Sequence, residues 1–338
     1  MKHLVLIAGT LIAAVLYGGC GNPTANPITP VTSGGWSRMD SVHTSAPVNT
    51  FASAGPNLVA GCVNGVLLSS DNGTTWVTVD SGLPANAWVT GFIVLGNNLY
   101  LSSQGNGVYV STNNGVSWTS ANSGVRNRFV QSITTDGTNL YAGTWGGLWG
   151  TTGGGVFRSS DGGKNWVEAN VGLTDTNVTA LTTSGTNIFA GTMSGGVFRS
   201  TDGGAHWNPV NIGLTYNWGI QALLVNGGNL YVSCVSYGLY VSTNYGSSWS
   251  SFGSGLPSKY VNSVAFSASD IFVGSGIGVS RSTDGGNTWS SYNTGLSDTL
   301  VSSLTVFGGY LFAGNYAQTV PRLYQGPLLS FGIWRRSP

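Results

Sequence analysis

Residues that could carry out catalysis are scarce in this chain of 338 residues, which has 12 Lys and Arg, 11 Asp and Glu and three His. Two aspartates stand in matching segments, Asp175 in GLTD and Asp298 in GLSD. Paired carboxylates on either side of a cleft are what most glycoside hydrolases use. Glu168 is the only glutamate. The sequence therefore offers one candidate acid pair, whose use depends on how far apart the fold holds it.

The other nucleophilic and metal-binding residue types form no cluster. His3 lies in an apolar N-terminal segment, His206 inside a repeated motif and His43 alone in a predicted loop. No Ser/His/Asp arrangement and no His/Cys metal-ligand spacing can be assembled from them. We therefore expect no catalytic residue, no metal and no cofactor, and we keep the acid pair as an alternative.

The composition predicts an all-β fold. Only 7% of the residues are charged, whereas an ordinary soluble domain has about 25%. The 53 glycines are about twice the usual share, and the hydrophobic fraction of 41% suffices for a core. A net charge of +1 argues against a nucleic-acid partner, because such binding depends mainly on neutralising many phosphates.

One unit of about 40 residues recurs along the chain. Six segments share the form Ser-x-Asp/Asn-x-Gly-x-x-Trp, called the box here: SSDNGTTW (69–76), STNNGVSW (111–118), SSDGGKNW (159–166), STDGGAHW (200–207), STNYGSSW (242–249) and STDGGNTW (282–289). Their tryptophans are 42, 48, 41, 42 and 40 residues apart, a period typical of four-stranded propeller blades. A first strand recurs seven times, beginning at Val48, Val89, Val130, Val178, Ile220, Val261 and Val301.

The chain ends indicate how the ring closes. After the last first strand, Gly332 to Arg335 align with a third strand that has no box or fourth strand after it. Trp36 stands 40 residues before Trp76, in the box tryptophan position. The sequence thus predicts a seven-bladed β-propeller of four-stranded antiparallel blades, in which the N-terminal strand completes the last blade and no sheet edge stays open.

The box is interpreted as a structural turn. A short carboxylate or amide at its third position can accept turn N–H bonds, glycine supplies unusual backbone angles, and the tryptophan fills space between outer strands. Calcium binding is the alternative, but each box offers at most one carboxylate, and Asn113 and Asn244 offer none.

These motifs resemble the Asp-box, or BNR, repeat over Trp36 to Arg336. The resemblance implies the propeller of sialidases, the sortilin ectodomain, xyloglucan hydrolases and photosystem II assembly factors, whose functions the motif does not separate. Sialidases need an arginine cluster, a tyrosine nucleophile activated by a glutamate and an acid/base aspartate, and Glu168 is expected on an outer strand. Asp175 and Asp298 are three blades apart, which is expected to be too far for direct catalysis.

Antiparallel connectivity sorts the loops onto two faces. The boxes and the turns between strands one and two share a lower face, whereas the turns between strands two and three and the inter-blade loops share an upper face. The candidate ligand-binding residues all lie in these upper loops: Trp88, Arg126, Arg128, Trp145, Trp149, Tyr216, Trp218, Tyr237, Lys259, Tyr260 and Arg322. Exposed aromatic rings beside polar groups suit a glycan or a peptide. The alternative is that these residues merely cap the blade rims.

Two sets of arginines can be distinguished. Arg126, Arg128 and Arg322 are expected on the upper face and would correspond to the basic patch with which photosystem II assembly factors hold a membrane-protein client. The other set shares one strand position and is expected to link neighbouring blades: Arg158, Arg199, Arg281 and Arg335.

The N-terminus is typical of an exported lipoprotein. A basic start and an apolar stretch lead to Gly18, Gly19 and Cys20, which resemble the bacterial lipobox, although Tyr17 departs from its usual aliphatic residue. We expect a signal at 1–19, a lipidated tether at 20–33 and a propeller at 34–338. Cleavage near Gly19 without lipidation is the alternative.

Cys62 and Cys234 occupy the same position in blades one and five. Three blade steps separate them, which is far beyond the distance of about 7 Å that a disulfide tolerates between Cα atoms. Both are expected to be reduced.

The preferred function is therefore binding. The sequence favours a monomeric propeller, anchored in the bacterial envelope by lipid on Cys20, that holds an envelope protein or a glycan through its upper loops. A glycosidase or sialidase-like propeller is the first alternative, and a structural cell-surface repeat protein is the second.

Overall fold

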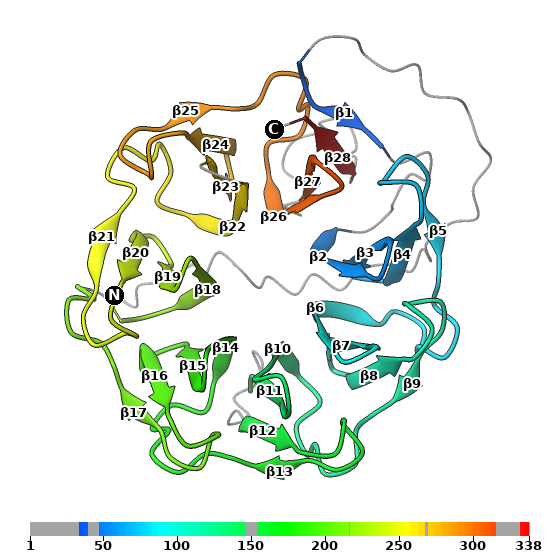
Figure 1. The fold of residues 1–338 in the computed structure, drawn as a ribbon, viewed down its shortest axis with the longest axis vertical. Helices are drawn as coiled ribbons and strands as arrows, with labels where there is room; N and C mark the ends of the chain where they lie inside the picture. Colours follow the sequence, from blue (N-terminus) through cyan, green and yellow to red (C-terminus); the bar gives the residue numbers. More distant parts are fainter. Residues whose placement is uncertain are drawn as a thin grey trace, which may run out of the picture.

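The computed structural model describes residues 34–39, 47–146, 154–215, 217–267, 270–315 and 332–337. These residues form strands and turns without a helix, in seven four-stranded antiparallel sheets. Figure 1 shows the sheets as blades of a closed ring, with the first strand of each blade facing the centre. The all-β, seven-bladed prediction is confirmed.

Each blade runs from an inner to an outer strand. Blades 1 to 3 contain β2 (Val48–Ala54), β3 (Asn57–Cys62), β4 (Gly65–Ser69) and β5 (Val77–Thr78); β6 (Trp88–Leu95), β7 (Asn98–Gln104), β8 (Gly107–Ser111) and β9 (Thr119–Ser120); and β10 (Val130–Thr135), β11 (Leu140–Thr144), β12 (Gly155–Ser159) and β13 (Val167–Glu168). Blades 4 and 5 contain β14 (Val178–Ser184), β15 (Asn187–Thr192), β16 (Val197–Ser200) and β17 (Asn208–Pro209); and β18 (Ile220–Asn226), β19 (Asn229–Cys234), β20 (Gly238–Ser242) and β21 (Ser250–Phe252).

Blades 6 and 7 complete the ring. Blade 6 contains β22 (Val261–Ser267), β23 (Asp270–Ser275), β24 (Gly278–Ser282) and β25 (Ser290–Ser291), and blade 7 contains β26 (Val301–Phe307), β27 (Tyr310–Asn315), β28 (Ile333–Arg336) and β1 (Ser37–Arg38). The predicted first-strand starts are confirmed in all blades but the second, where the strand begins one residue earlier, at Trp88. Every inner strand has a register shift after its start, for example between Val48 and Thr50.

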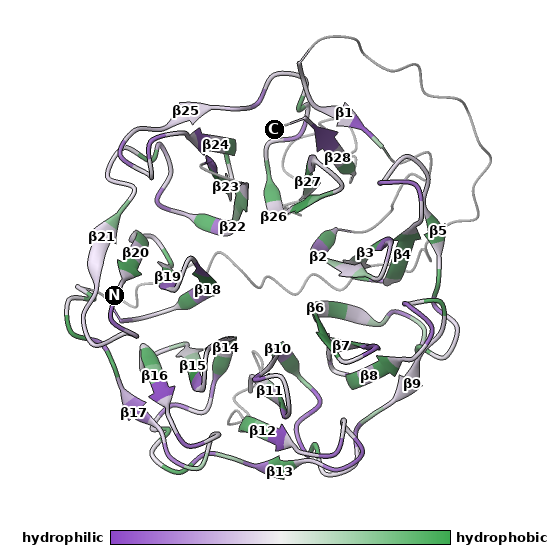
Figure 2. Ribbon diagram, in the orientation of Figure 1, coloured by the Kyte–Doolittle hydropathy of each residue, from purple (hydrophilic) through white to green (hydrophobic). Residues whose placement is uncertain are grey.

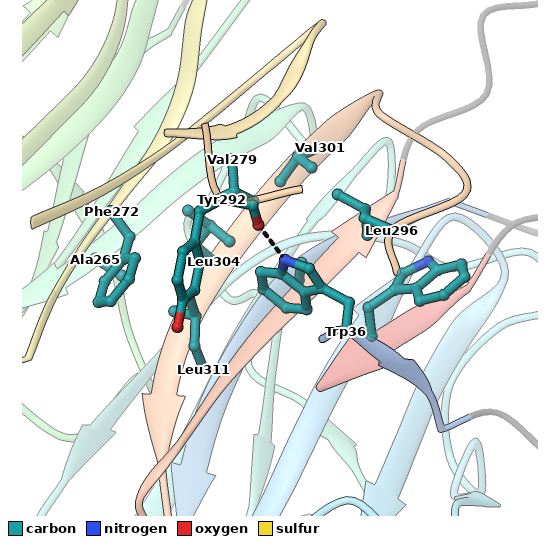
Figure 3. Packing of buried hydrophobic residues seen from close by; sticks show 11 residues of the cluster. Trp36, Ala265, Phe272, Val279, Tyr292, Leu296, Val301, Leu304 and Leu311 are labelled. Atoms are coloured by element: carbon teal, nitrogen blue, oxygen red, sulfur yellow. Dashed lines mark hydrogen bonds between the residues drawn. The ribbon is translucent and has the colours of Figure 1, made fainter. Parts of the chain in front are cut away.

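The N-terminal strand closes the ring as predicted. In blade 7 the strand order is β1, β28, β27, β26, so the first and last strands of the protein are hydrogen-bonded neighbours. Figure 1 shows β1 in blue beside β28 in red. Trp36 is only 2% exposed, and its indole N–H donates to the Tyr292 carbonyl of the preceding blade at 2.6 Å (Figure 3). The closing strand is thus held by a buried ring as well as by its ladder.

The core lies between the blades. Each of its seven clusters joins residues from two neighbouring blades. In Figure 2 the third strands β4 and β8 carry the hydrophobic colour, whereas the outermost strands β17 and β25 are hydrophilic or pale. Because both faces of a blade pack against neighbours, few strand positions meet water, which accounts for the small number of charged residues.

Polar bonds near the centre link successive inner strands. The Thr90 hydroxyl donates to the Val130 carbonyl at 2.7 Å, and the Thr179 hydroxyl donates to the Ile220 carbonyl at 2.6 Å. The Ser302 hydroxyl donates to the Val48 carbonyl, which joins the last blade to the first. The ring is therefore continuous at its inner rim as well as at its core.

Candidate functional site

The boxes on the lower face stabilise their own turns. In the fourth box the Ser200 hydroxyl donates to Asp202 at 2.9 Å and accepts from the Gly204 N–H, while Asp202 Oδ1 accepts the His206 N–H at 2.9 Å. The other boxes repeat this pattern, with Asn113 and Asn244 replacing the aspartate in two of them. The interpretation of the box as a structural turn is confirmed.

These bonds also set the acidity of the box carboxylates. The His206 backbone N–H is the largest influence that lowers the pKa of Asp202 to about 2. The Asn165 backbone N–H has the same effect on Asp161, whose pKa is also about 2. The carboxylates are engaged in their turns, and the described residues contain no group of three or more His, Cys, Asp or Glu that could hold a metal ion.

In most blades the tryptophan at the box position fastens the blade to the one before it. The Trp118 indole N–H donates to the Val79 carbonyl at 3.0 Å, and its backbone N–H donates to Ser81 at 2.8 Å, both in the preceding blade. The boxes of blades 3, 4 and 5 repeat both bonds, and so does Trp36. Gly82 is needed here, because a Cβ at this residue, whose φ is +87°, would lie 1.8 Å from the Trp118 carbonyl oxygen.

Two tryptophans depart from this pattern: Trp76 of blade 1, whose indole N–H donates to Gly73 of its own box at 3.1 Å, and Trp289 at the seam between blades 5 and 6. The Trp289 indole N–H donates to Gly286 of its own box at 3.1 Å rather than to blade 5, and the ring is only half-buried. Its edge instead meets Phe252, with ring centroids 6.4 Å apart. The core cluster of this seam has the fewest buried residues of the seven. Among the described seams, this one therefore combines the missing indole bond with the smallest buried core, and we call it weakly joined.

An amide clamps the turn between strands two and three on the upper face of most blades. In blade 2 the Asn122 side chain accepts the Val108 N–H at 2.7 Å and donates to the Asn106 carbonyl at 3.1 Å. The same pair of bonds recurs in blades 3, 4 and 6 with the amides Asn170, Asn211 and Asn293. Blade 1 has Asp80 at this position and blade 5 has Gly253. Among the described turns, the blade 5 turn is therefore the one whose clamping position carries no side chain.

Four of the sequence-predicted ligand-binding residues come together at this unclamped turn. Trp218 precedes Gly219, whose carbonyl accepts the Val235 N–H of the turn at 3.0 Å. Tyr237 precedes Gly238, whose N–H donates to the Lys259 carbonyl at 3.1 Å, and Tyr260 follows directly. Trp218, Tyr237 and Tyr260 are 41%, 39% and 48% exposed. We call these three residues the aromatic row.

Sequence reasoning missed one residue beside the row. Ile277, in the corresponding turn of blade 6, is 49% exposed. It occupies the same position as Tyr237, directly before a turn glycine, where blades 1 to 4 have Asn64, Asn106, Gly154 and Gly195. Comparing that column between repeats would have singled out blades 5 and 6 as the two with large apolar residues there.

The remaining predicted binding residues are dispersed or lie outside the description. Trp88 is half-buried at the start of β6, and Trp145 is only 7% exposed, so its ring is a packing element rather than an open platform. Arg126 forms a salt bridge with Glu168 at 3.5 Å, beside the outer strand of blade 3, and Arg128 is exposed beside the blade 2 turn. Trp149, Tyr216 and Arg322 lie outside the described residues.

The candidate acid pair is engaged in turns. Asp175 accepts the Ser194 N–H at 2.6 Å and the Gly195 N–H at 3.1 Å, which fixes the upper turn of blade 4. Asp298 accepts the Leu300 N–H at 3.1 Å at the entrance to blade 7. The repeated GLTD and GLSD segments thus have a structural use in both places.

The arginine column only partly links blades. Arg199 donates to the Tyr245 carbonyl of the next blade at 3.0 Å, and Arg335 donates to Asn72 of blade 1 at 2.8 Å. Arg158 instead donates to Asn139 of its own blade at 3.0 Å, and Arg281 pairs with Asp270 of its own blade. The expectation of an inter-blade hydrogen bond is confirmed for the first two residues. The other two bond within their own blades, where a suitable acceptor follows the inner strand, although the Arg158 guanidinium also lies beside Gly203 of the next blade.

Cys62 and Cys234 are buried thiols outside any disulfide, which confirms the prediction that they are reduced. Burial raises the pKa of the Cys234 thiol to about 12. Neither thiol is part of an exposed reactive site.

Comparison with known proteins supports the fold. No protein-family profile matches the sequence, and no curated protein does. Among solved structures, the chain is similar to the extracellular domain of the putative one component system BT4673 from B. thetaiotaomicron, with a TM-score of 0.67 and 12% identity over 89% of this chain and 40% of that one. This chain therefore spans about 40% of the length of that relative.

Two further structures are similar. YCF48 from Cyanidioschyzon merolae has a TM-score of 0.62 and 16% identity over 90% of this chain and 98% of that one. The GH74 enzyme of Niastella koreensis has a TM-score of 0.61 and 18% identity over 86% of this chain and 43% of that one. At such identities the likeness establishes the propeller fold alone. The described residues include no helix that is long and apolar enough to cross a membrane.

Proposed function

We propose that this protein is a non-catalytic binding propeller of the Asp-box type, exported to the bacterial cell envelope, that holds a protein or glycan partner through its upper-face loops. The observation that carries the proposal is the aromatic row, in which Trp218, Tyr237 and Tyr260 stand 39% to 48% exposed on adjoining segments. Large aromatic side chains left exposed together on a rigid scaffold are typical of binding surfaces.

The polar groups with candidate chemistry are occupied on both faces. On the lower face the serine, carboxylate and amide groups of the boxes bond to their own turns. On the upper face the carboxylates of Asp175 and Asp298 are likewise occupied by backbone N–H groups, which favours binding over hydrolysis. The exposed rings of Trp218 and Tyr260 are the upper-face groups that we assign to contact with a partner.

The solved structures support a binding role by analogy. One YCF48 structure is of that protein bound to D1 peptide, and its TM-score to this chain is 0.64. The BT4673 domain is extracellular, in keeping with an envelope location. Lipid attachment at Cys20 rests on the sequence of the N-terminal segment, where acyl chains would contribute about 0.8 kcal/mol per buried methylene to membrane binding.

The test is retention of envelope material by the full-length protein. Protein and polysaccharide fractions from the bacterial envelope are passed over the immobilised wild type, a Trp218→Ala/Tyr260→Ala variant, and a Val116→Ser variant. Val116 is a matched control, because it is an exposed apolar residue of a lower-face box. We expect the upper-face variant to lose retention while the control keeps it. Equal retention by all three proteins, or none by the wild type, would refute the proposal.

Lipid attachment has a separate test. Intact-mass measurement of the protein recovered from membranes should show an acylated mature N-terminus at Cys20. A Cys20→Ser variant should appear in the soluble fraction with the same thermal stability. An unmodified Cys20 in membrane-bound protein would contradict this part of the proposal.

A further inference from the structure

Three irregularities of the fold coincide at the aromatic row. The blade 5 turn has Gly253 where four other blades have a clamping asparagine. Ser236 in that turn is a non-glycine residue with a φ of 66°. The buried Ser233 hydroxyl at the end of β19 has no hydrogen-bond partner. Strained backbone and unsatisfied polar groups are concentrated at functional sites more often than elsewhere.

The segment that carries the row has charge of one sign. Residues 217–267 contain no aspartate or glutamate, and Lys259 is their only charged residue. Lys259 lies between two members of the row. Its side chain approaches Gly238, the neighbour of Tyr237, closely enough that a Cβ added there would be 3.2 Å away, and Tyr260 is the next residue in the chain. None of the salt bridges found in the described segments involves Lys259. The row therefore has one cation on its own segments. The nearest acid identified is Asp175 in the adjoining blade 4 turn, whose carboxylate is engaged by the Ser194 and Gly195 N–H groups.

The backbone around the row is already hydrogen-bonded. The Gly219 N–H donates to Met193, the Val235 N–H donates to Gly219 and the Gly238 N–H donates to Lys259. The Tyr260 N–H donates to the Ser258 hydroxyl at 3.1 Å. A peptide that binds by strand addition needs unpaired backbone groups in the protein. What this surface offers a ligand is ring faces and an ammonium group instead.

The geometry points to an acidic polysaccharide as the ligand of this surface. We propose that the sugar rings of a linear, uronate-containing chain stack on Trp218, Tyr237 and Tyr260, and that a carboxylate of the chain pairs with Lys259. Because the aromatic residues come from adjoining segments and are not buried in a pocket, they suit a polymer that presents apolar ring faces repeatedly. This inference rests on the proposed function and names its ligand class.

The inference is tested by direct binding of the full-length protein to defined probes. Polygalacturonate is the acidic glycan, its fully methyl-esterified form is the neutral match, and poly-glutamate is an acidic peptide without sugar rings. Titration calorimetry at low and at physiological salt compares the wild type with the double variant Trp218→Ala/Tyr260→Ala, with Lys259→Met and with the lower-face control Val116→Ser. Circular dichroism and thermal unfolding of each variant confirm that it is folded.

We expect polygalacturonate to bind, the double variant Trp218→Ala/Tyr260→Ala to bind at least tenfold more weakly, and Val116→Ser to match the wild type. Lys259→Met should reduce the preference for the acidic over the esterified glycan by up to about fivefold, since an exposed ion pair contributes at most about 1 kcal/mol. The preference should also shrink in salt.

Other outcomes would overturn the inference in distinct ways. Equal binding of both glycans with no effect of Lys259→Met would remove the acidic specificity, and binding of poly-glutamate alone would point to a peptide. If neither glycan binds while retention of an envelope protein still depends on Trp218 and Tyr260, the glycan inference fails and the proposed binding function stands. If retention also fails, both fall.

Discussion

Asp80 stands where other blades use an asparagine, and replacing it by asparagine should stabilise the protein at neutral pH. Asp80 Oδ1 accepts the Val66 N–H at 2.7 Å, just as Asn122 accepts the N–H of Val108. The position of a Cβ added to the turn glycine serves as a common reference point. Asp80 Oδ2 lies 2.6 Å from this point at Gly65, and Asn293 Nδ2 lies 2.5 Å from it at Gly278, so the two atoms occupy equivalent places. An ionised oxygen therefore occupies the place of an amide that donates to the turn.

The size of the expected gain in stability follows from the hydrogen-bond donor that Asp80 lacks. In blade 6 the Asn293 amide donates to the Ile277 carbonyl at 3.0 Å, and one such bond contributes about 1 kcal/mol net to folding. Asp80→Asn keeps the bond from Val66 and adds a donor in place of an acceptor. We expect the free energy of unfolding to rise by about 1 kcal/mol at pH 7, which corresponds to roughly 2 °C in melting temperature for a chain of this size.

The gain should depend on pH. Burial raises the pKa of the Asp80 carboxyl above its ordinary value of 3.8, and the bond from the Val66 N–H opposes this only in part. A raised pKa means that the folded protein binds the proton more tightly than the unfolded chain does. The stabilising effect of the protonated carboxyl is present below pH 3.8 and is lost as the pH rises through the folded pKa. The difference between Asp80→Asn and wild type should therefore be small near pH 3.5 and largest at pH 7.

Urea unfolding followed by tryptophan fluorescence, from pH 3.5 to 8, measures this difference directly. The reciprocal variant Asn122→Asp is the matched control, since it places a carboxylate in a blade that has the amide; it should be destabilised, more at pH 7 than at pH 4. Asp80→Ala, which also loses the acceptor for Val66, should be less stable than Asp80→Asn. A lower urea midpoint for Asp80→Asn at pH 7, or a difference that does not change with pH, would refute the reasoning.

Three further predictions concern closure, the boxes and the thiols. Trp36→Ala should lower the free energy of unfolding, measured by calorimetry, by about 3 to 5 kcal/mol, because it leaves a cavity at a buried site of the closing blade. A decrease below about 1 kcal/mol would mean that β1 is not needed for closure. The pKa of Asp202 is lowered to about 2, so the ionised carboxylate stabilises the folded protein above pH 3.8, and this contribution is lost as the pH falls toward 2. Asp202→Asn should therefore make the urea midpoint depend less on pH in this range, and an unchanged pH dependence would contradict the prediction. Iodoacetamide at pH 8 should modify Cys62 and Cys234 only in denaturant, as read by intact mass, and rapid labelling of folded protein would show that they are accessible.

The repeat made most of the fold predictable. Six boxes and seven first strands in one period set the number of blades, and the tryptophan at position 36 identified the strand that closes the ring. Local chemistry supported this, because the Ser200, Asp202 and Gly204 pattern forms its turn from bonds within a few residues. Interactions this local can be inferred from residue types and spacing alone.

The site could be predicted only in part. Connectivity placed Trp145 and Trp218 on the same face, yet one ring is 7% exposed and the other 41%. Arg126 was expected to contribute to a basic patch, and the structure pairs it with Glu168, 42 positions further along the sequence. Such outcomes depend on neighbours contributed by other loops, and a repeat period gives no information about them.

The sequence by itself determined the architecture, because a motif that cannot bury its own hydrophobic face must be stacked against its copies until the ring closes. Only the tertiary structure decided where the ring differs from its own repeat. The weakly joined seam of blades 5 and 6, the unclamped turn at Gly253 and the exposed row of Trp218, Tyr237 and Tyr260 arise where segments of neighbouring repeats meet. Their meeting depends on packing across blades, which residue spacing along one chain does not specify.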